Sequence, residues 1–191
     1  MRIILMGPPG AGKGTQATVI SNHFGIPHIS SGEIFRRNIK ANTPLGIAAR
    51  GYIDQGNYVP DDITNGMIHD RLAESDAAKG FLLDGYPRTL AQIHNLDETL
   101  VELGHSIDAV VEMTADPEEV VHRLLARAEV EGRTDDNDAV IRNRLVVYHQ
   151  QTAPLTQVYA ERGLLRQVDA LGTIEDVSDR ILAVLASVSS R

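Results

Sequence analysis

The 191-residue sequence predicts an α/β fold with a five-stranded parallel sheet flanked by helices, on three observations. Five short apolar runs recur along the chain, and each is as uniformly apolar as a strand buried on both faces of a parallel sheet. Helical patterns lie between these runs. A glycine-rich turn follows the first run and precedes a helix, which is the required context of a phosphate-binding loop. We therefore expect five buried strands with functional residues near their carboxyl ends.

The expected strands alternate with helices whose start and stop signals can be read directly. The strands are residues 2–6, 27–30, 81–84, 107–113 and 165–169. A helix over residues 15–24 ends at Gly25, because glycine readily adopts the left-handed conformation that closes a helix. After the second strand, Ser30 and Glu33 have the spacing of a capping box and begin another helix.

Later segments continue this alternation. Residues 89–103 place leucine and isoleucine on one stripe of a helix that stops at Gly104, and Pro117 occupies the first turn of the next helix. Two stretches do not fit this alternation of strands and helices. Residues 31 to about 61 hold helical pieces without a strand, and residues 128–136 form a short polar segment between two helices. We expect both stretches to move relative to the sheet.

The composition is typical of a soluble globular protein, with 42% hydrophobic and 23% charged residues, and the length suits one domain. The sequence has no cysteine, which excludes disulfides, a thiol nucleophile and cysteine-based zinc sites. A net charge of −8 argues against binding to nucleic acid or an acidic membrane. No apolar run approaches the roughly 20 residues that cross a bilayer, and no signal peptide is apparent. We expect a cytoplasmic monomer.

The glycine-rich turn reads GPPGAGKGT from Gly7 to Thr15. Its glycines let backbone N–H groups converge on an anion, the helix N-terminus adds partial positive charge, and Lys13 reaches the terminal phosphates. Most such loops carry Ser or Thr directly after the lysine, whereas here Gly14 intervenes and Thr15 supplies the hydroxyl. Direct contact of Thr15 with magnesium is therefore left open. The residues expected to bind the triphosphate here are Gly10, Ala11, Gly12, Lys13, Gly14 and Thr15.

Polar residues near the third strand suggest a place for magnesium and a second phosphate. Asp84 ends this strand, where a carboxylate can organise magnesium or its waters beside the phosphates; the alternative is a turn aspartate. Arg88 and Arg36 are placed to face a monophosphate across the strand ends, although either arginine alone fits a surface charge.

Four arginines lie within a 22-residue stretch, at positions 123, 127, 133 and 144. Phosphoryl transfer needs positive charge around the moving group more than it needs an acid or base, so these arginines are catalytic candidates. The alternative is a helix face that is ion-paired with Asp135, Asp136 and Asp138. Arg142 is the weakest candidate, since it lies two positions from Arg144 and need not face the same way.

These motifs resemble the nucleoside monophosphate kinase family, and most closely its adenylate kinases. The form Gly-x-Pro-Gly-x-Gly-Lys-Gly-Thr is that family's loop, and the later motifs follow in the family's order over nearly the whole chain. The resemblance implies a P-loop NTPase fold in a single domain, 1–191. Its parts would be a core of residues 1–29, 62–126 and 138–191, an NMP-binding segment over 30–61, and a short lid over 127–137. The implied reaction is reversible transfer from Mg-ATP to AMP, giving two ADP.

The resemblance also implies residue roles. Arg123 and Arg127 would hold ATP phosphates, Arg133 and Arg144 would bridge to the monophosphate, and Gly172 would approach the ATP adenine. The implied catalytic set is Lys13, Arg88, Arg123, Arg127, Arg133 and Arg144. The implied AMP site is Ser31, Arg36, Asn57, Tyr58, Val59, Gly85, Tyr86, Pro87, Arg88, Gln92, Arg133 and Arg144.

Gln92 bears on the identity of the acceptor base. A glutamine amide can donate to and accept from the Watson–Crick edge of adenine, and the resemblance implies that this position reads AMP. Ser31 replaces the threonine common in the family but keeps the hydroxyl. An exposed helix glutamine is the alternative reading.

Two other functions remain open: a UMP/CMP kinase of the same fold, and a P-loop regulatory switch. Gln92 and Ser31 favour adenine over the pyrimidines. Guanine-reading switches use Asn-Lys-x-Asp, and none of the three lysines follows an asparagine. The seven histidines form no pair at ligand spacing, and the short lid lacks the larger insertion that carries zinc in some relatives. We expect magnesium with ATP as the cofactor and no structural zinc.

Overall fold

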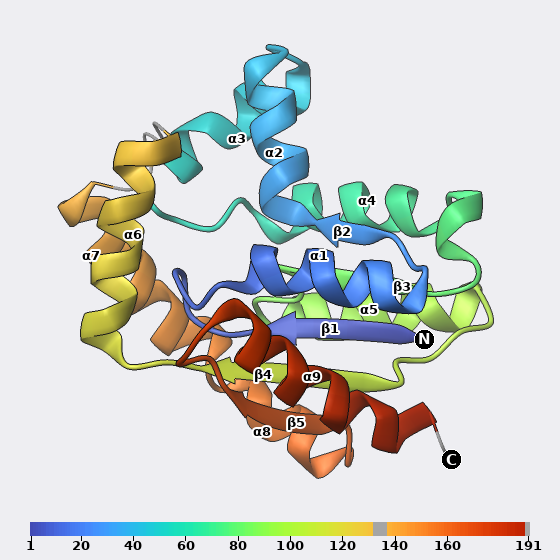
Figure 1. The fold of residues 1–191 in the computed structure, drawn as a ribbon. Coiled ribbons are helices and arrows are strands. Elements are labelled where there is room, and N and C mark those ends of the chain that lie inside the picture. Colours follow the sequence, from blue (N-terminus) through green and yellow to red (C-terminus); the bar gives the residue numbers. More distant parts are fainter. Residues whose placement is uncertain (132–136, 190–191) are drawn as a thin grey trace.

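The computed structural model describes residues 1–131 and 137–189, and its centre is a five-stranded sheet with all neighbouring strands parallel (Figure 1). The order across the sheet is β2-β3-β1-β4-β5. The strands are β1 (Arg2–Met6), β2 (His28–Ser30), β3 (Phe81–Asp84), β4 (Ala109–Thr114) and β5 (Leu165–Asp169). The predicted α/β class and parallel sheet are confirmed, and the strand boundaries differ from those predicted by at most two residues.

Helices connect successive strands, as parallel pairing requires. They are α1 (Lys13–Phe24), α2 (Ser31–Lys40), α3 (Pro44–Asp54), α4 (Asp61–Leu72), α5 (Leu90–Glu102), α6 (Pro117–Glu131), α7 (Asp138–Val147), α8 (Leu155–Glu161) and α9 (Ile174–Ser189). A 3₁₀ turn spans Ser75–Ala77 and a π-helix spans Tyr148–Thr152. Ser30 caps α2 and Thr89 caps α5 through their hydroxyls, and α1 closes at Gly25 in the left-handed conformation. The predicted helix ends therefore hold to within two residues.

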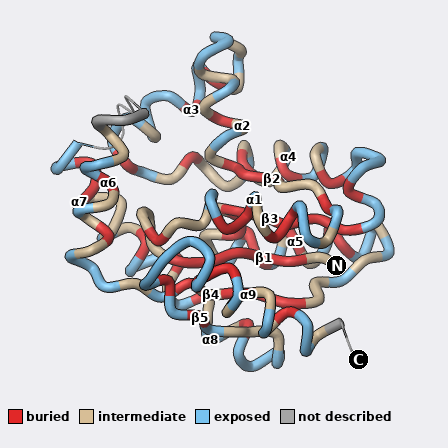
Figure 2. Tube along the Cα trace, viewed as in Figure 1, coloured by how far each residue is buried: buried red, intermediate tan, exposed pale blue. Residues whose placement is uncertain are grey.

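Alternate side chains of the strands enter two separate hydrophobic cores, because successive residues of a strand point to opposite faces. Ile3 and Leu5 pack with α1 and α9 on one face, whereas Ile4 and Met6 pack with α4, α5 and α8 on the other. Buried residues follow the sheet through the middle of the molecule (Figure 2). The result is a three-layer arrangement that fixes the carboxyl ends of β1 and β3 side by side.

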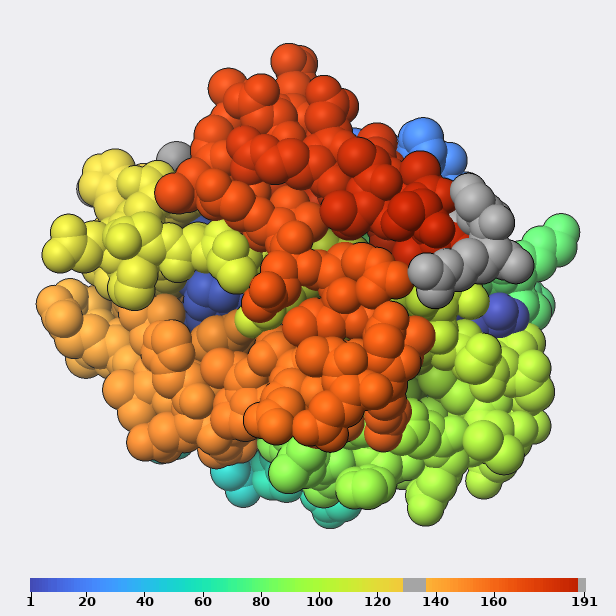
Figure 3. Space-filling model, turned by 90° about the horizontal axis from the view of Figure 1, so that it is seen from below, coloured from blue at the N-terminus to red at the C-terminus, as the bar shows by residue number. Residues whose placement is uncertain are grey.

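The prediction that all five strands are buried is wrong for β5. Only Val168 of its five residues is buried, and Gln167 is exposed. This strand lies at an edge of the sheet and pairs with β4 on one side alone. Seen from below, the C-terminal elements form much of the surface on this side of the molecule (Figure 3).

Two smaller clusters stand apart from the sheet. Phe35, Ala49 and Val59 pack together in the segment over residues 31–61, which contains helices and no strand, as predicted. Val120, Leu124 and Ile141 join α6 to α7. The expected polar segment over 128–136 begins as helix, since α6 continues to Glu131, and residues 132–136 lie outside the described part. No helix of the described chain is long and apolar enough to cross a membrane.

Candidate active site

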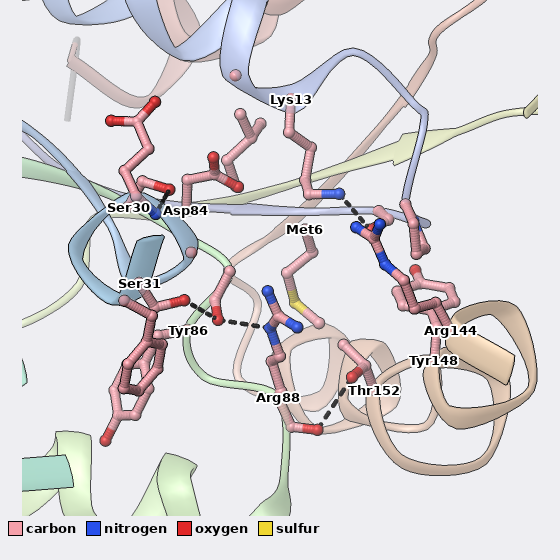
Figure 4. A pocket seen from close by; sticks show the side chains of 18 of the residues that line it. Met6, Lys13, Ser30, Ser31, Asp84, Tyr86, Arg88, Arg144, Tyr148 and Thr152 are labelled. Atoms are coloured by element: carbon pink, nitrogen blue, oxygen red, sulfur yellow. Dashed lines mark hydrogen bonds between the residues drawn. The ribbon is translucent and has the colours of Figure 1, made fainter. Parts of the chain in front are cut away.

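The carboxyl ends of β1 and β3 open into a cavity of about 600 Å³, between the segment over residues 30–61 and helices α6 and α7. Most of the predicted site residues line it, although they come from segments far apart in the sequence (Figure 4). The predicted residues in the lining are Gly10, Gly12, Lys13, Gly14, Thr15, Ser31, Arg36, Asn57, Tyr58, Val59, Asp84, Gly85, Tyr86, Pro87, Arg88, Gln92, Arg123, Arg127 and Arg144.

Two predicted residues of the described chain are not part of this lining. Ala11 is buried in the core beneath the glycine-rich loop, and its backbone N–H donates to the Pro8 carbonyl at 3.2 Å. Gly172 lies in the connection between β5 and α9. Arg133 falls outside the described residues.

The loop after β1 adopts a shape that depends on glycine. Gly10 and Gly12 have φ values of 86° and 87°, in the left-handed region. A Cβ on Gly10 would lie 2.8 Å from the Val120 carbonyl oxygen, so a larger residue does not fit beneath α6. Gly12 is the N-cap of α1, and the N-terminal end of that helix therefore borders the cavity. This is the geometry in which backbone N–H groups bind phosphate.

Lys13 is the first residue of α1 and is held by the loop itself. Its Nζ donates to the carbonyl oxygens of Gly7 at 2.7 Å and Pro8 at 2.8 Å. Its pKa is lowered from 10.5 to about 8, mainly by burial and also by the nearby arginines at 88, 127 and 144, whereas Asp84 opposes the shift. Positive charge from the loop, from the segment after β3 and from α6 and α7 therefore converges here, which is favourable for an incoming polyanion.

Asp84 ends β3 beside Lys13. Burial alone would raise its pKa, but His28, Lys13 and Arg88 together hold the pKa below its ordinary value. His28 Nε2 lies 3.4 Å from Asp84 Oδ2. An ionised carboxylate facing the phosphate loop is the ligand type that magnesium prefers, so the donor chemistry fits a magnesium ion carried by a nucleotide. Among the described residues, no group of three or more His, Asp or Glu could hold a metal ion in the absence of a nucleotide.

A single carbonyl orients two side chains on the opposite wall. The Gly85 carbonyl oxygen accepts from Ser31 Oγ and from Arg88 Nε, both at 2.7 Å (Figure 4). The guanidinium of Arg88 also stacks on the Tyr58 ring, 4.8 Å from its centre. These contacts direct the Arg88 guanidinium toward the cavity, where it can meet a phosphate bidentately.

Gln92 is buried at the far end of the same wall, with an exposed fraction of 2%. Its Oε1 accepts from the Arg88 backbone N–H at 2.7 Å, and its Nε2 donates to Asp61 Oδ1 at 2.6 Å. The exposed helix glutamine considered above is therefore excluded for this residue.

Of the described arginines between residues 123 and 144, three line the cavity and one does not. Arg127 and Arg144 line the cavity. Arg123 also reaches it, while its Nε donates to Glu119 at 2.8 Å and its Nη1 donates to the Ala170 carbonyl at 3.3 Å. Arg142, the weakest candidate, is instead paired with Asp138 at the surface. The ion-paired helix face proposed as an alternative thus exists for Arg142.

Comparison with known proteins now places this site in a family. A family model described as adenylate kinase matches residues 5–164. The chain belongs to the adenylate kinase family. It is 54% identical to an adenylate kinase of Pseudarthrobacter chlorophenolicus, over 99% of this chain and 98% of that protein. An adenylate kinase of Thermobifida fusca is 54% identical over 98% and 99%, and one of a Nocardioides species is 55% identical over 97% of each chain.

Membership of the adenylate kinase family confirms the expected class of enzyme, a nucleotide-binding phosphotransferase that works between ATP and AMP. Adenylate kinases use magnesium with ATP, which agrees with the carboxylate at Asp84. Nothing in the comparisons favours the two alternatives, a UMP/CMP kinase or a regulatory switch.

Sequence reasoning missed three side chains that contact predicted residues of this cavity. Thr152, in the π-helix, donates to the Arg88 carbonyl at 3.0 Å and shares a 2.7 Å hydrogen bond with Tyr58. Asp61 binds Gln92, and His28 approaches Asp84. One signal was available for His28: a histidine inside a short apolar strand requires a polar partner at the sheet end.

Proposed function

We propose that this cavity transfers a phosphoryl group reversibly between ATP, bound on the glycine-rich loop, and AMP, bound between residues 30–61 and Arg88. One observation carries the proposal. Lys13, Asp84 and Arg88 converge on one cavity that has two walls, one formed by the loop and one by the segment after β2. Two walls provide a place for a donor and a place for an acceptor, which a nucleotide switch does not need.

The donor site we propose begins at the loop. Backbone N–H groups of Gly12, Gly14 and Thr15 at the start of α1 would surround the triphosphate. Lys13 would exchange its two loop carbonyls for phosphate oxygens. Arg123 and Arg127 would contact the same phosphates from α6, and Gly172 would approach the adenine, although it lies outside the cavity lining.

The acceptor site we propose is the opposite wall. Arg36 and Arg88 would bind the monophosphate, and Gln92 would bind the adenine edge. Arg144 would reach the same phosphate from α7, and Arg133 is assigned to it from the sequence alone. The remaining members would be Ser31, Asn57, Tyr58, Val59, Gly85, Tyr86 and Pro87, all of which line the wall.

In the reaction, an oxygen of the AMP phosphate forms a bond to the γ-phosphorus while the bond from that phosphorus to the β–γ bridging oxygen breaks, leaving ADP on both sides. No side chain must gain or lose a proton, so the protein contributes position and charge. Lys13 and Arg88 stabilise the negative charge that spreads over the transferred group. Asp84 would help hold the magnesium ion, which supplies further charge neutralisation on the phosphates when bound.

Water must be kept from the same γ-phosphoryl group, and we assign this task to two segments that close over the ligands. Residues 30–61 would form the NMP-binding segment and residues 127–137 a short lid, with the remaining chain as core. The protein is expected to act as a cytoplasmic monomer without nucleic acid or membrane, which light scattering and a pull-down against DNA would test.

The proposal is tested with a panel of acceptors. AMP, dAMP, CMP, UMP and GMP are each offered with Mg-ATP, and diphosphate formation is measured. We expect the highest kcat/KM for AMP. Equal or faster use of CMP or UMP would assign the acceptor site to pyrimidines, and ATP hydrolysis without any acceptor dependence would assign the protein to the switch class.

A further inference from the structure

Asp61, the first residue of α4, lies behind Gln92 and is not part of the cavity lining. Its carboxylate is engaged at both oxygens. Oδ1 accepts from Gln92 Nε2 at 2.6 Å, and Oδ2 accepts from the Thr89 hydroxyl at 2.8 Å. The Thr89 hydroxyl itself accepts from the Gln92 backbone N–H at 3.1 Å, so its proton is free to be donated to Asp61. The carboxylate is thus held from two sides.

The polarity of these bonds leaves the Gln92 amide one orientation. The Arg88 backbone N–H can only donate, so the group facing it at 2.7 Å must be Oε1. The Asp61 carboxylate can only accept, so the group facing it must be Nε2. Turning the amide over would place two donors together at Arg88 and two acceptors together at Asp61. Both contacts would be lost in a buried position, where an unpaired polar group is costly.

A fixed amide distinguishes two kinds of purine. Adenine presents a donor at N6 and an acceptor at N1, whereas a 6-oxopurine such as hypoxanthine presents an acceptor at O6 and a donor at N1. Glutamine complements both patterns, but in opposite orientations. After its bonds to Arg88 and Asp61, the Gln92 amide retains one N–H and one oxygen lone pair, enough for one of these edges.

We propose that Asp61 is a positioning residue for acceptor specificity, which fixes the Gln92 amide in the orientation that complements adenine and thereby rejects 6-oxopurine monophosphates. This inference rests on the proposed role of Gln92 at the acceptor base. Asp61 never touches the nucleotide; it acts by removing the flipped state of Gln92, in which hypoxanthine would be accepted.

The test compares AMP with inosine monophosphate as acceptors, using the ratio of their kcat/KM values in the full-length enzyme. In Asp61→Asn the side chain keeps its size, but its amide can offer Gln92 either a donor or an acceptor. We expect the AMP preference to fall about five- to tenfold, through a higher KM for AMP and a lower KM for inosine monophosphate, with the ATP KM unchanged. Asp61→Ala, which removes the acceptor, should shift the ratio in the same direction, so the test does not depend on one variant folding.

The matched control is Asp76→Asn. Asp76 also holds a partner through both oxygens, Arg71 at 2.8 Å for each bond, but it lies outside the cavity lining. The AMP preference of this variant should equal that of the wild type.

A double-mutant cycle separates positioning from a general structural effect. In a Gln92→Leu background, Asp61→Asn should leave the ratio unchanged, because the amide on which Asp61 acts is gone. The inference is overturned if Gln92→Leu raises the AMP KM while Asp61→Asn keeps the wild-type ratio, or if Asp61→Asn alters the ratio equally in both backgrounds. A Gln92→Leu enzyme with a normal AMP KM would instead refute the proposed role of Gln92 itself.

Discussion

The Nζ atom of Lys13 donates a hydrogen bond to the Gly7 carbonyl oxygen at 2.7 Å, so the ammonium group is folded back onto the loop that precedes it. This contact and its neighbour at Pro8 hold a charge that burial disfavours. The stability of the protein should therefore carry a signature of Lys13 that is independent of catalysis.

That signature is a pH dependence. The folded state binds the Lys13 proton with a pKa of about 8, below the ordinary value of 10.5, so between these values the unfolded chain carries more of this proton. The free energy of unfolding must therefore rise with pH through this window. The destabilisation caused by burying the charged ammonium group is fully present below about pH 8. Relative to Lys13→Met, the free energy of unfolding of the wild type should rise by roughly 3 kcal/mol across the window. Urea denaturation of both proteins at several pH values measures this, and parallel curves would contradict it.

Arg88 should matter for turnover far more than for folding. Arg88→Ala removes the guanidinium that stacks on Tyr58 and faces the cavity, and we expect kcat to fall roughly 100- to 1,000-fold, the loss typical of a charge-stabilising contact. Arg88→Lys keeps the charge but not the planar fork and should be intermediate. Arg142→Ala is the control, because Arg142 is paired with Asp138 at the surface. Near-normal turnover of a folded Arg88→Ala enzyme would remove Arg88 from the site.

Gly85 should be required for AMP binding because Arg88 and Ser31 leave no space for a side chain at this position. Its φ is 77°, and a Cβ there would lie 2.8 Å from both Arg88 Nη2 and Ser31 Oγ. Gly85→Ala should raise the AMP KM more than the ATP KM and cost about 1 to 2 kcal/mol of stability. Gly163→Ala is a matched control, with a φ of 72° and open space at the Cβ position. It should show a similar loss of stability with unchanged KM values. If Gly85→Ala also leaves the AMP KM unchanged, the space around Gly85 is not required for AMP binding.

The fold was predictable from the sequence where burial requires a strand to consist of apolar residues. β1 and β3 are buried along nearly their whole length, so their residues had to be apolar and the runs are visible. The place of β5 at the sheet edge was not predictable, because strand order is set by packing between distant segments. The end of α6 was missed because residues 128–131 were included in the polar segment expected over 128–136, yet alanine and glutamate, which occupy three of these four positions, are good helix formers.

The lining of the cavity was predictable where its residues belong to a recognisable motif at the end of a strand, as Lys13 and Asp84 do. Asp61 and Thr152 were not, because each acts through a side-chain hydrogen bond to a residue from another element. In the sequence alone, Asp61 is an ordinary acidic residue in the first turn of a helix. Only the folded chain reveals that its carboxylate meets Gln92.

Metal removal should separate the cofactor from the fold. A chelator should stop catalysis, because magnesium accompanies ATP, but should leave the melting temperature of the protein without nucleotide unchanged. The described residues have no cluster of three or more potential zinc ligands, and the sequence has no cysteine. Thermal denaturation with and without chelator is the measurement, and a lower melting temperature with chelator would reveal a structural metal.

Closure of the two walls should be driven by filling both at once. The segment over residues 30–61 already contacts α7, through Asn143, whose Nδ2 donates to the Gln55 carbonyl at 2.8 Å and to Asn57 Oδ1 at 3.0 Å. A molecule with two adenosines joined by a polyphosphate would occupy both sites and bind the closed state better than the open one. At about 1,000 times its dissociation constant it should add about 4 kcal/mol of stability.

Hydrogen exchange should slow more in residues 30–61 and around Arg127 than in the sheet, because closure buries those segments while the sheet is protected already. Protection confined to residues 7–15 would mean that only the donor site exists, and the acceptor site would have to be abandoned.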